Sequence, residues 1–410
     1  MAVLAFGTYS TQTPTVAVPS LPSNFDVNQY VAPARIPESS ASEPTGNFRF
    51  ICEYSHLNFD DPILYPGQPG KAHLHVYFGN RLASASSNYE NLRLTGGGSC
   101  QGGPINRSAY WMPAVLNASG LVVAPAYATV YYKATFGGIA GIQAVPSLPR
   151  GLVMIAGFDM ATGLGEGQHW RCENGGPHQA TIPACGPDDK AGASVAFPQC
   201  WDGVNLDSAN HRSHLAYIFY SPDTGKPTCP TTHPVHIPEF TFTAWYPTPA
   251  GTNGWRLSSD MGRPAGSSLH SDWIGAWDDG ILDTWTKKCL NGLLNCIGGE
   301  LGDGRTLVGV EDYTGPSLIE PPGLPPVPPT STTSTTTTTP TTSTVPGTTT
   351  IEWETKPGMY YYLRWRQPGG MWVTKAGVSS PYVVSGLQPG TYTFEVKAVP
   401  AFQQVAVVRV

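Results

Sequence analysis

The chain has 410 residues, more than one ordinary hydrophobic core accommodates, so two or more domains are expected. Its 23 basic and 29 acidic residues give a net charge of -6, and no block of Lys or Arg exists to follow a phosphate backbone, which argues against nucleic acid as a partner. Charged residues make up only 13%, whereas 46 Gly and 40 Pro favour short strands and turns over long helices.

The first segment, residues 1–46, is rich in Pro, Ser, Thr and Val and shows no amphipathic period. It is predicted to be an extended arm that either docks on a partner or stays loose. Its start has no basic leading segment and no sustained apolar run, unlike a secretion signal. No stretch of the chain reaches about 18 uncharged apolar residues, so no membrane span is predicted.

A β-rich body is predicted over residues 47–313. Apolar or alternating runs bounded by turn residues, such as FRFICEY, ATVYYKATF and EFTFTAWY, are typical of strands. Their number favours a mainly β fold, either a sandwich or a jelly roll. One short helix is predicted over residues 279–293, where apolar residues recur near helical spacing.

The eight cysteines all lie between residues 52 and 296. None has the CxxC spacing of a zinc or redox site, so disulfides are favoured, and Cys289 with Cys296 is the pair most easily predicted. Disulfides indicate an oxidising place outside the cell. A protein that works there without a secretion signal can reach it on a virion released by lysis; the alternative is a secreted protein whose signal was replaced by Met1.

A Pro/Thr-rich linker is predicted over residues 314–350, followed by a small β-sandwich over residues 351–410. In TYTFEVKAV, Tyr392, Phe394 and Val396 alternate with polar residues, as in a strand with one buried face. Together with YYYLRWRQPGG and the turn VSGLQPGTY, this segment resembles a fibronectin type III or related immunoglobulin-like module.

Limited proteolysis tests this division. We expect the first cuts between Pro321 and Thr350, because that segment carries no residues that would form a protecting core. Mass spectrometry of the early fragments identifies the cleaved bonds. Early cleavage inside the body, with the linker intact, would contradict the predicted domains.

The stretch GQPGKAHLHVYFGN places two histidines one residue apart after a turn. Alternation along a strand puts His73 and His75 on one side, with Leu74 and Val76 on the other. Two imidazoles on one face can ligate an ion, grip a polar substrate or join a hydrogen-bonded network.

All ten histidines lie in the body, and several of them belong to the ordered motifs YSH, DDP, HLH, FGN, CWDG, LDS, SH, HPV and LHxD. This order is similar to that of the family called domain of unknown function nineteen-ninety-six, and the resemblance covers about 260 residues. The family name implies no activity. The resemblance indicates the following site candidates: His56, Asp60, Asp61, His73, His75, Asp202, Asp207, His211, His214, His270 and Asp272.

Four kinds of site remain open for these residues. A metal site would use His73, His75 and His214 as ligands, with Asp60 or Asp61 as the carboxylate, and its cofactor would be a divalent metal. A carboxylate site would draw an acid and a base from Asp60, Asp61, Asp207, His211, His270 and Asp272. The same residues can instead form a hydrogen-bonded scaffold, or a sugar-binding cleft without chemistry. In each case we expect His73 and His75 to face inward and meet His214, and Asp60 or His270 as well.

Trp111, Trp201 and Trp277 are candidates for stacking on sugar rings, although large aromatics also fill sandwich cores. From these features the chain is expected to be a virion surface protein, such as a phage minor tail component, whose body contacts host cell-envelope polysaccharide. Other virion proteins would be bound through the N-terminal arm. The alternative is a secreted glycan-cleaving enzyme with a His/Asp site. Either protein would work on a virion surface or outside the cell.

Overall fold

The structure, a computed structural model, describes most of the chain. The described residues are 18–39, 45–134, 144–223, 225–310, 315–322, 348–353, 361–367, 373–376, 378, 380–398 and 401–409. The beginning of the predicted arm, residues 1–17, and most of the predicted linker, residues 323–347, lie outside them.

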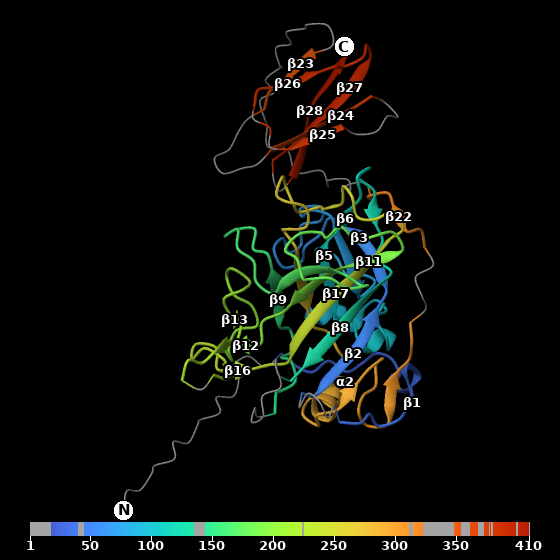
Figure 1. Ribbon diagram of the computed structural model, residues 1–410, viewed down its shortest axis with the longest axis vertical. Coiled ribbons are helices and arrows are strands. Elements are labelled where there is room, and N and C mark those ends of the chain that lie inside the picture. The colour runs from blue at the N-terminus through green and yellow to red at the C-terminus, as the bar shows by residue number, and fades with distance from the viewer. Residues whose placement is uncertain are drawn as a thin grey trace, which may run out of the picture.

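Two sheets form the body and confirm the predicted sandwich (Figure 1). The larger has the order β10 (Gln168–Cys172), β11 (Asp189–Ala196), β17 (Glu239–Thr248), β8 (Tyr127–Lys133), β2 (Asn47–Cys52) and β20 (Asn295–Cys296). The smaller has the order β3 (Tyr54–Asn58), β4 (His75–Gly79), β5 (Ala109–Pro113), β19 (His270–Ile274) and β9 (Val153–Gly157). All neighbours are antiparallel except β2 and β20.

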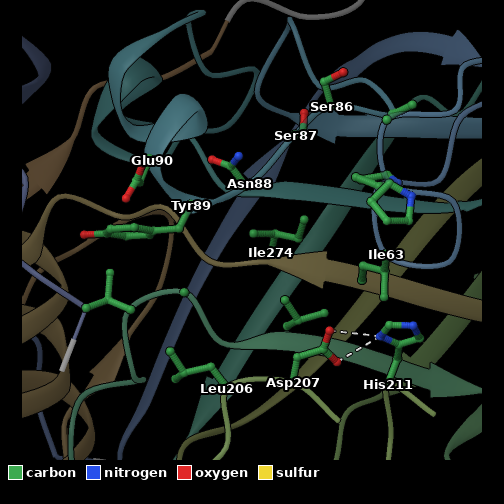
Figure 2. A pocket seen from close by; sticks show the side chains of 17 residues that line it. Ile63, Ser86, Ser87, Asn88, Tyr89, Glu90, Leu206, Asp207, His211 and Ile274 are labelled. Carbon is green, nitrogen blue, oxygen red and sulfur yellow. Dashed lines mark hydrogen bonds and ion pairs between the residues drawn. The ribbon is translucent and has the colours of Figure 1, made fainter. Parts of the chain in front are cut away.

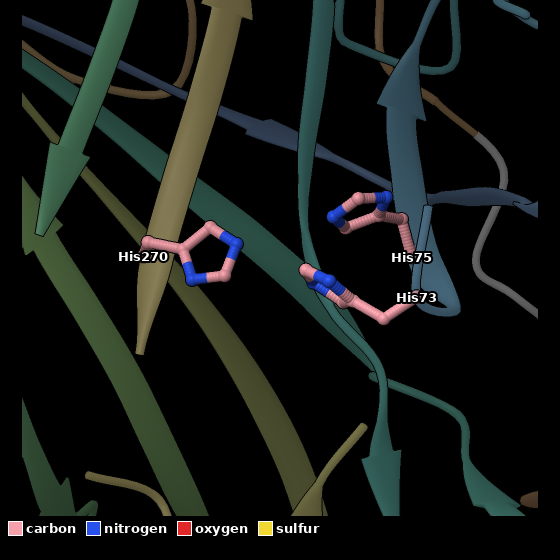
Figure 3. Close-up of side chains that lie close together, drawn as sticks. All are labelled: His73, His75 and His270. Carbon is pink, nitrogen blue, oxygen red and sulfur yellow. The ribbon is translucent and has the colours of Figure 1, made fainter. Parts of the chain in front are cut away.

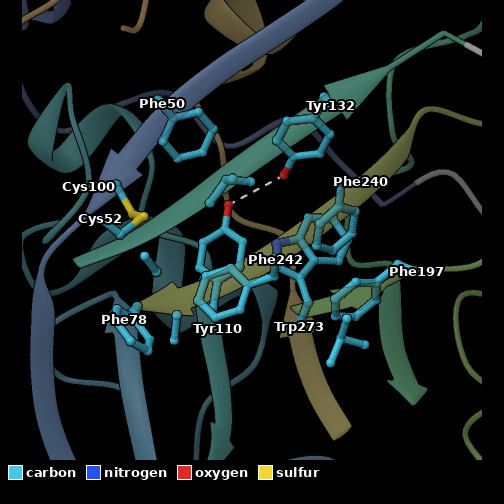
Figure 4. Close-up of a cluster of buried hydrophobic side chains, with 14 of the residues drawn as sticks. Phe50, Cys52, Phe78, Cys100, Tyr110, Tyr132, Phe197, Phe240, Phe242 and Trp273 are labelled. Atoms are coloured by element: carbon cyan, nitrogen blue, oxygen red, sulfur yellow. Dashed lines mark hydrogen bonds between the residues drawn. A yellow bond between two sulfur atoms is a disulfide. The ribbon is translucent and has the colours of Figure 1, made fainter. Parts of the chain in front are cut away.

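Aromatic side chains fill the space between the two sheets (Figure 4). Tyr110 of β5 stacks on Phe242 of β17 with ring centroids 5.3 Å apart, and Phe78 of β4 meets the same ring edge-on at 5.2 Å. Trp273 of β19 lies 5.4 Å from Phe240 of β17. Each fully buried ring contributes about 1.5–3 kcal/mol, so this layer holds the smaller sheet firmly on the larger one.

Short strands extend the body beyond its predicted limits at residues 47 and 313. Strand β1 (Val31–Pro33), from the predicted arm, pairs with β21 (Arg305–Leu307). Strand β22 (Leu318–Ile319), from the predicted linker, pairs with β7 (Val122–Val123). Part of the arm therefore docks on the body of its own chain.

The remaining small elements border the two sheets. The further strands are β6 (Val115–Leu116), β12 (Cys200–Trp201), β13 (Leu215–Ala216), β14 (Phe219–Tyr220), β15 (Pro227–Thr228), β16 (Val235–His236) and β18 (Arg256–Leu257). They form three small sheets, β18-β6-β7-β22, β13-β12-β16 and β14-β15. Two 3-10 turns are η1 (Val27–Tyr30) and η2 (Gly103–Ile105).

The predicted helix is present as α2 (Asp279–Trp285), which continues as the π-helical η3 (Thr286–Leu290). Asp278 caps α2 by accepting the backbone N–H of Ile281. A second short helix, α1 (Tyr89–Leu94), was not predicted; Asn88 caps it in a capping box. No helix among the described residues is long and apolar enough to cross a membrane.

All eight cysteines are paired in disulfides. The pairs are Cys52–Cys100, Cys172–Cys185, Cys200–Cys229 and Cys289–Cys296. The predicted Cys289–Cys296 bond is confirmed. Four disulfides indicate that the protein works outside the cell, because reducing cytosol does not maintain them.

The C-terminal residues form a small β module with its own core. Its sheets are β23 (Thr348–Ile351) with β26 (Tyr382–Ser385), and β25 (Val373–Ala376), β24 (Tyr361–Arg366), β27 (Thr391–Ala398) and β28 (Ala401–Arg409) in that order. Tyr392, Phe394 and Val396 are buried, as the alternation predicts. The closer likeness to fibronectin type III remains a prediction.

Candidate functional site

The candidate site lies on the face of the five-stranded sheet that points away from the aromatic core. Successive side chains of a strand point to opposite faces. Val76 and Trp273 therefore enter the core, whereas His75, His270 and Asp272 point to the other face, where loops bury them. Strand β5 lies between β4 and β19, so side chains from these two strands meet above it.

Three imidazoles meet on this face (Figure 3). The ring centroids of His73 and His75 are 4.2 Å apart, and the His270 ring lies 5.1 Å from the first and 6.2 Å from the second. The prediction that His73 and His75 share a side is confirmed. Gly157 of β9 pairs with His270 at a φ of 81°. A Cβ there would lie 2.9 Å from the His270 Cα, so glycine is needed beside the site.

Asp60 anchors the loop that precedes β4. Its carboxylate accepts hydrogen bonds of 2.8 Å each from the backbone N–H groups of Gly70 and Ala85 and from the Asn58 amide. Its backbone carbonyl accepts Nδ1 of His75 at 2.9 Å. Because both carboxylate oxygens already have donors, Asp60 holds the loop and orients His75. Of the two residues predicted to meet the histidine pair, Asp60 or His270, it is His270 that does so.

Burial keeps two of the imidazoles neutral. Both His75 and His270 are buried, and burial lowers the pKa of each to about 4. Nδ1 of His270 donates to the backbone carbonyl of Ser268 at 2.8 Å. At neutral pH both rings are therefore uncharged and carry one N–H each. In each ring one nitrogen is hydrogen-bonded to a backbone carbonyl.

Two carboxyl groups lie beside the imidazoles. One ligand atom from each of Asp61, His75 and Asp272 lies within 4.8 Å of the other two. Burial raises the pKa of Asp61, an effect that the backbone N–H groups of Leu64 and Ile63 reduce. Burial, and then the charge of Asp61, raise the pKa of Asp272 well above its usual range. Ionisation of either carboxyl therefore disfavours ionisation of the other.

These five residues, His73, His75, His270, Asp61 and Asp272, are called the histidine–aspartate cluster below. A pocket of about 430 Å³ opens onto it. All of its members except His75 line the pocket, and His75 is fully buried behind them. A ligand in this pocket would therefore meet both carboxyl groups and two imidazoles.

The walls of this pocket combine apolar and basic side chains, namely Tyr65, Phe158, Met261, Lys71 and Arg212. The guanidinium of Arg212 donates to the carbonyls of Gly157 at 3.3 Å and Phe158 at 3.2 Å, which fastens the loop before β13 to the end of β9. None of these residues was singled out from the sequence. Arg212 lies in the motif HRSH between two predicted histidines, and that position is the one signal that pointed to it.

A second, wider pocket of about 750 Å³ shares His211 with the first (Figure 2). Nδ1 of His211 lies 2.9 Å from each carboxylate oxygen of Asp207, which also lines the wider pocket. His211 adopts a φ of 56°, an uncommon conformation for a residue with a side chain. Asp207 and His211 thus form a pair of their own on the wall, separate from the cluster.

Residues 61–277, more than half of the chain, match the family described as Domain of unknown function (DUF1996). The chain belongs to the DUF1996 family. All five cluster residues and the Asp207–His211 pair lie inside the matched segment. No curated protein and no solved structure matches the chain. The DUF1996 description assigns no activity, so function has to be argued from the site.

His214 does not join the histidine–aspartate cluster, so the expectation that it would meet His73 and His75 is wrong. Its Nε2 bonds the carbonyl of Val153 at 2.8 Å, and its Nδ1 lies 3.0 Å from the hydroxyl of Ser208. Val153 pairs with Ile274, four residues along β19 from His270. At about 3.3 Å per residue this places the two ends roughly 13 Å apart. His214 instead ties the loop before β13 to the start of β9.

The three tryptophans that were candidates for stacking on sugars are all buried, as the alternative of a core role predicts. Trp111 is 0% exposed, Trp201 4% and Trp277 3%. Trp111 stacks on Tyr77 beneath the cluster, and the indole N–H of Trp201 donates to the backbone carbonyl of Asn205. None offers a ring face to a ligand, so their role is packing.

Two further candidates hold turns or pack inside the domain. Asp202 accepts the backbone N–H groups of Val204 and Asn205 at 2.8 Å each. His56 bonds the carbonyl of Ala83 through Nε2, and its ring stacks on Tyr77 at 4.8 Å. Neither residue lines the pocket over the histidine–aspartate cluster, so both stabilise the structure around the site.

Proposed function

We propose that the DUF1996 body is an extracellular hydrolase that acts on a glycan, with the histidine–aspartate cluster as its reacting centre. The observation that supports this proposal is the placement of that cluster at the inner end of a pocket of about 430 Å³. Pockets of this size are typical of small-ligand sites. Buried, convergent titratable groups with shifted pKa values make a pocket a candidate catalytic site.

The side chains of the pocket supply the two proton transfers of hydrolysis. Asp272, which burial keeps protonated, gives its proton to the leaving oxygen as the bond to the sugar carbon breaks. Nε2 of His211 takes the proton of the attacking water, and Asp207 stabilises the imidazolium through Nδ1. The Asp61 and Asp272 oxygens lie within 4.8 Å, closer than the roughly 6.5–9.5 Å of inverting carboxylate pairs, which disfavours that arrangement.

The pocket walls fit a sugar as substrate. Tyr65 and Phe158 offer apolar rings, and sugars bind by placing their C–H faces against such rings. Lys71 and Asn210 add hydrogen-bond donors on the same walls. A cell-envelope polysaccharide, entering by one chain end or as a released fragment, is the partner that this lining suits best.

A glycan screen tests the proposal. The intact chain is incubated with soluble cell-envelope polysaccharides, and new reducing ends are counted. We expect at least one glycan to be cleaved, and Asp272→Asn to lower the rate about 100-fold or more, because general acid catalysis contributes about 10²–10⁴-fold.

Asp202→Asn is the matched control, since Asp202 is a hydrogen-bonded carboxylate of the same domain that lies outside the pocket. It should leave cleavage unchanged. An equal loss in both variants would contradict the assignment of Asp272. Glycan binding without any product would overturn hydrolysis and favour the other expected function, a virion surface protein that only contacts envelope glycan.

A further inference from the structure

The hydrogen bonds behind the cluster determine where its ring protons lie. A backbone carbonyl only accepts, so Nδ1 of His75, 2.9 Å from the Asp60 carbonyl, must carry a hydrogen. The same holds for Nδ1 of His270, 2.8 Å from the Ser268 carbonyl. In the neutral rings Nε2 then holds a lone pair. A backbone carbonyl behind an imidazole is the usual support of a metal-binding histidine.

Two polar atoms of the cluster lack a partner within the described part of the chain. Nε2 of His75 is buried and has no hydrogen-bond partner among the described residues, and the same is true of Oδ2 of Asp272. Asp61 accepts two backbone N–H groups through Oδ1 and has no proton to donate when ionised. Buried polar atoms without a hydrogen-bond partner are costly. A cation between them removes that cost.

The geometry limits the cluster to one ion. Two sets of ligand atoms lie within 4.8 Å of one another, His73 with His75 and His270, and Asp61 with His75 and Asp272. His75 belongs to both sets. Because its Nδ1 is committed to the Asp60 carbonyl, it can ligate through Nε2 alone. An imidazole nitrogen binds one ion, so His75 can hold a single ion whichever of the two sets completes the site.

We propose that the histidine–aspartate cluster binds one divalent transition-metal ion of the zinc type, with Nε2 of His75 as its central ligand. The three imidazoles, alone or with one carboxylate, match the three or four protein donors that zinc and its neighbours take, whereas Mg²⁺ and Ca²⁺ prefer all-oxygen sites. The pocket reaches His73, His270 and both carboxyl groups, so an open coordination position would face the ligand space. The inference goes beyond the proposed hydrolysis, since a chain that cleaves nothing can still hold this ion.

Calorimetric titration with ZnCl₂ tests the site on the full chain after dialysis against a chelator. We expect one ion per chain, and His75→Ala to weaken binding about 100-fold or more. His214→Ala is the matched control, because His214 is equally buried and also bonds a backbone carbonyl but lies outside the cluster. It should bind zinc like the unchanged protein. Full binding by the His75 variant, or an equal loss in both variants, would overturn the proposal.

Cobalt spectroscopy gives a readout that needs no variant and no substrate. CoCl₂ added to the metal-free chain should produce the visible bands of low-coordinate Co²⁺, and one equivalent of ZnCl₂ should remove them. No thiolate band is expected, since every cysteine is in a disulfide. A spectrum unchanged from aqueous Co²⁺ would overturn the proposal even if the glycan screen succeeds. A bound ion without glycan cleavage would leave it standing and refute only the proposed activity.

Discussion

Replacing Asp60 with alanine should lower the free energy of unfolding of the body by about 3–4 kcal/mol, because each buried donor left without an acceptor costs about 1–3 kcal/mol. Asp60 is 3% exposed, and its carboxylate accepts the N–H groups of Gly70 and Ala85 and the amide of Asn58. These bonds close the loop before β4. Urea unfolding followed by intrinsic fluorescence measures the change.

Asp202→Ala provides a closely matched comparison. Asp202 also accepts two backbone N–H groups and one Asn amide, from Val204 and Asn205, but these groups lie at the surface. Water replaces the lost acceptor there, so the expected cost is about 1 kcal/mol or less. Similar losses in the two variants would show that burial of Asp60 does not decide its contribution.

Alternation along strands allowed us to predict which site residues of one strand share a side. HLH places His73 and His75 on one side, and LHSD places His270 and Asp272 on one side of another strand, by the same period of two. The pairing of these two segments depends on β5 lying between β4 and β19. That order joins residues almost 200 positions apart, and no local pattern encodes it.

The error over His214 has the same origin. The sequence shows a histidine near other candidate residues, but its position depends on where the loop before β13 meets the sheet. The loop meets β9 at Val153, the end of that strand opposite to Gly157 and His270. The same loop brings His211 and Arg212 to the pocket, and neither position follows from composition or periodicity.

The long strands were predicted from the sequence, whereas two-residue strands were missed. EFTFTAWY forms most of β17 and FRFICEY contains most of β2, and both alternate or are continuously apolar. Strands β7 and β22 have two residues each, too few to show any period. Their pairing extends the body past residue 313, which a Pro-rich composition had assigned to the linker.

Asp272→Asn should lower the stability of the body only when zinc is present. Without metal, burial keeps Asp272 protonated, so the neutral amide replaces a neutral carboxyl and removes no charge. In chelator the variant should therefore match the unchanged chain to within about 1 kcal/mol. Thermal unfolding in a chelator measures this half of the prediction.

With zinc the two chains should differ in stability, because an ion that binds only the folded protein adds about 2.7 kcal/mol at 100 times its dissociation constant. The unchanged chain gains this stabilisation in full, whereas the variant has lost a carboxylate next to the ion and gains less. Asp207→Asn is the control, since Asp207 is exposed and pairs with His211 outside the cluster; its response to zinc should match that of the unchanged chain. An equal gain in stability from zinc in the Asp272 variant and in the unchanged chain would contradict the placement of Asp272 next to the ion.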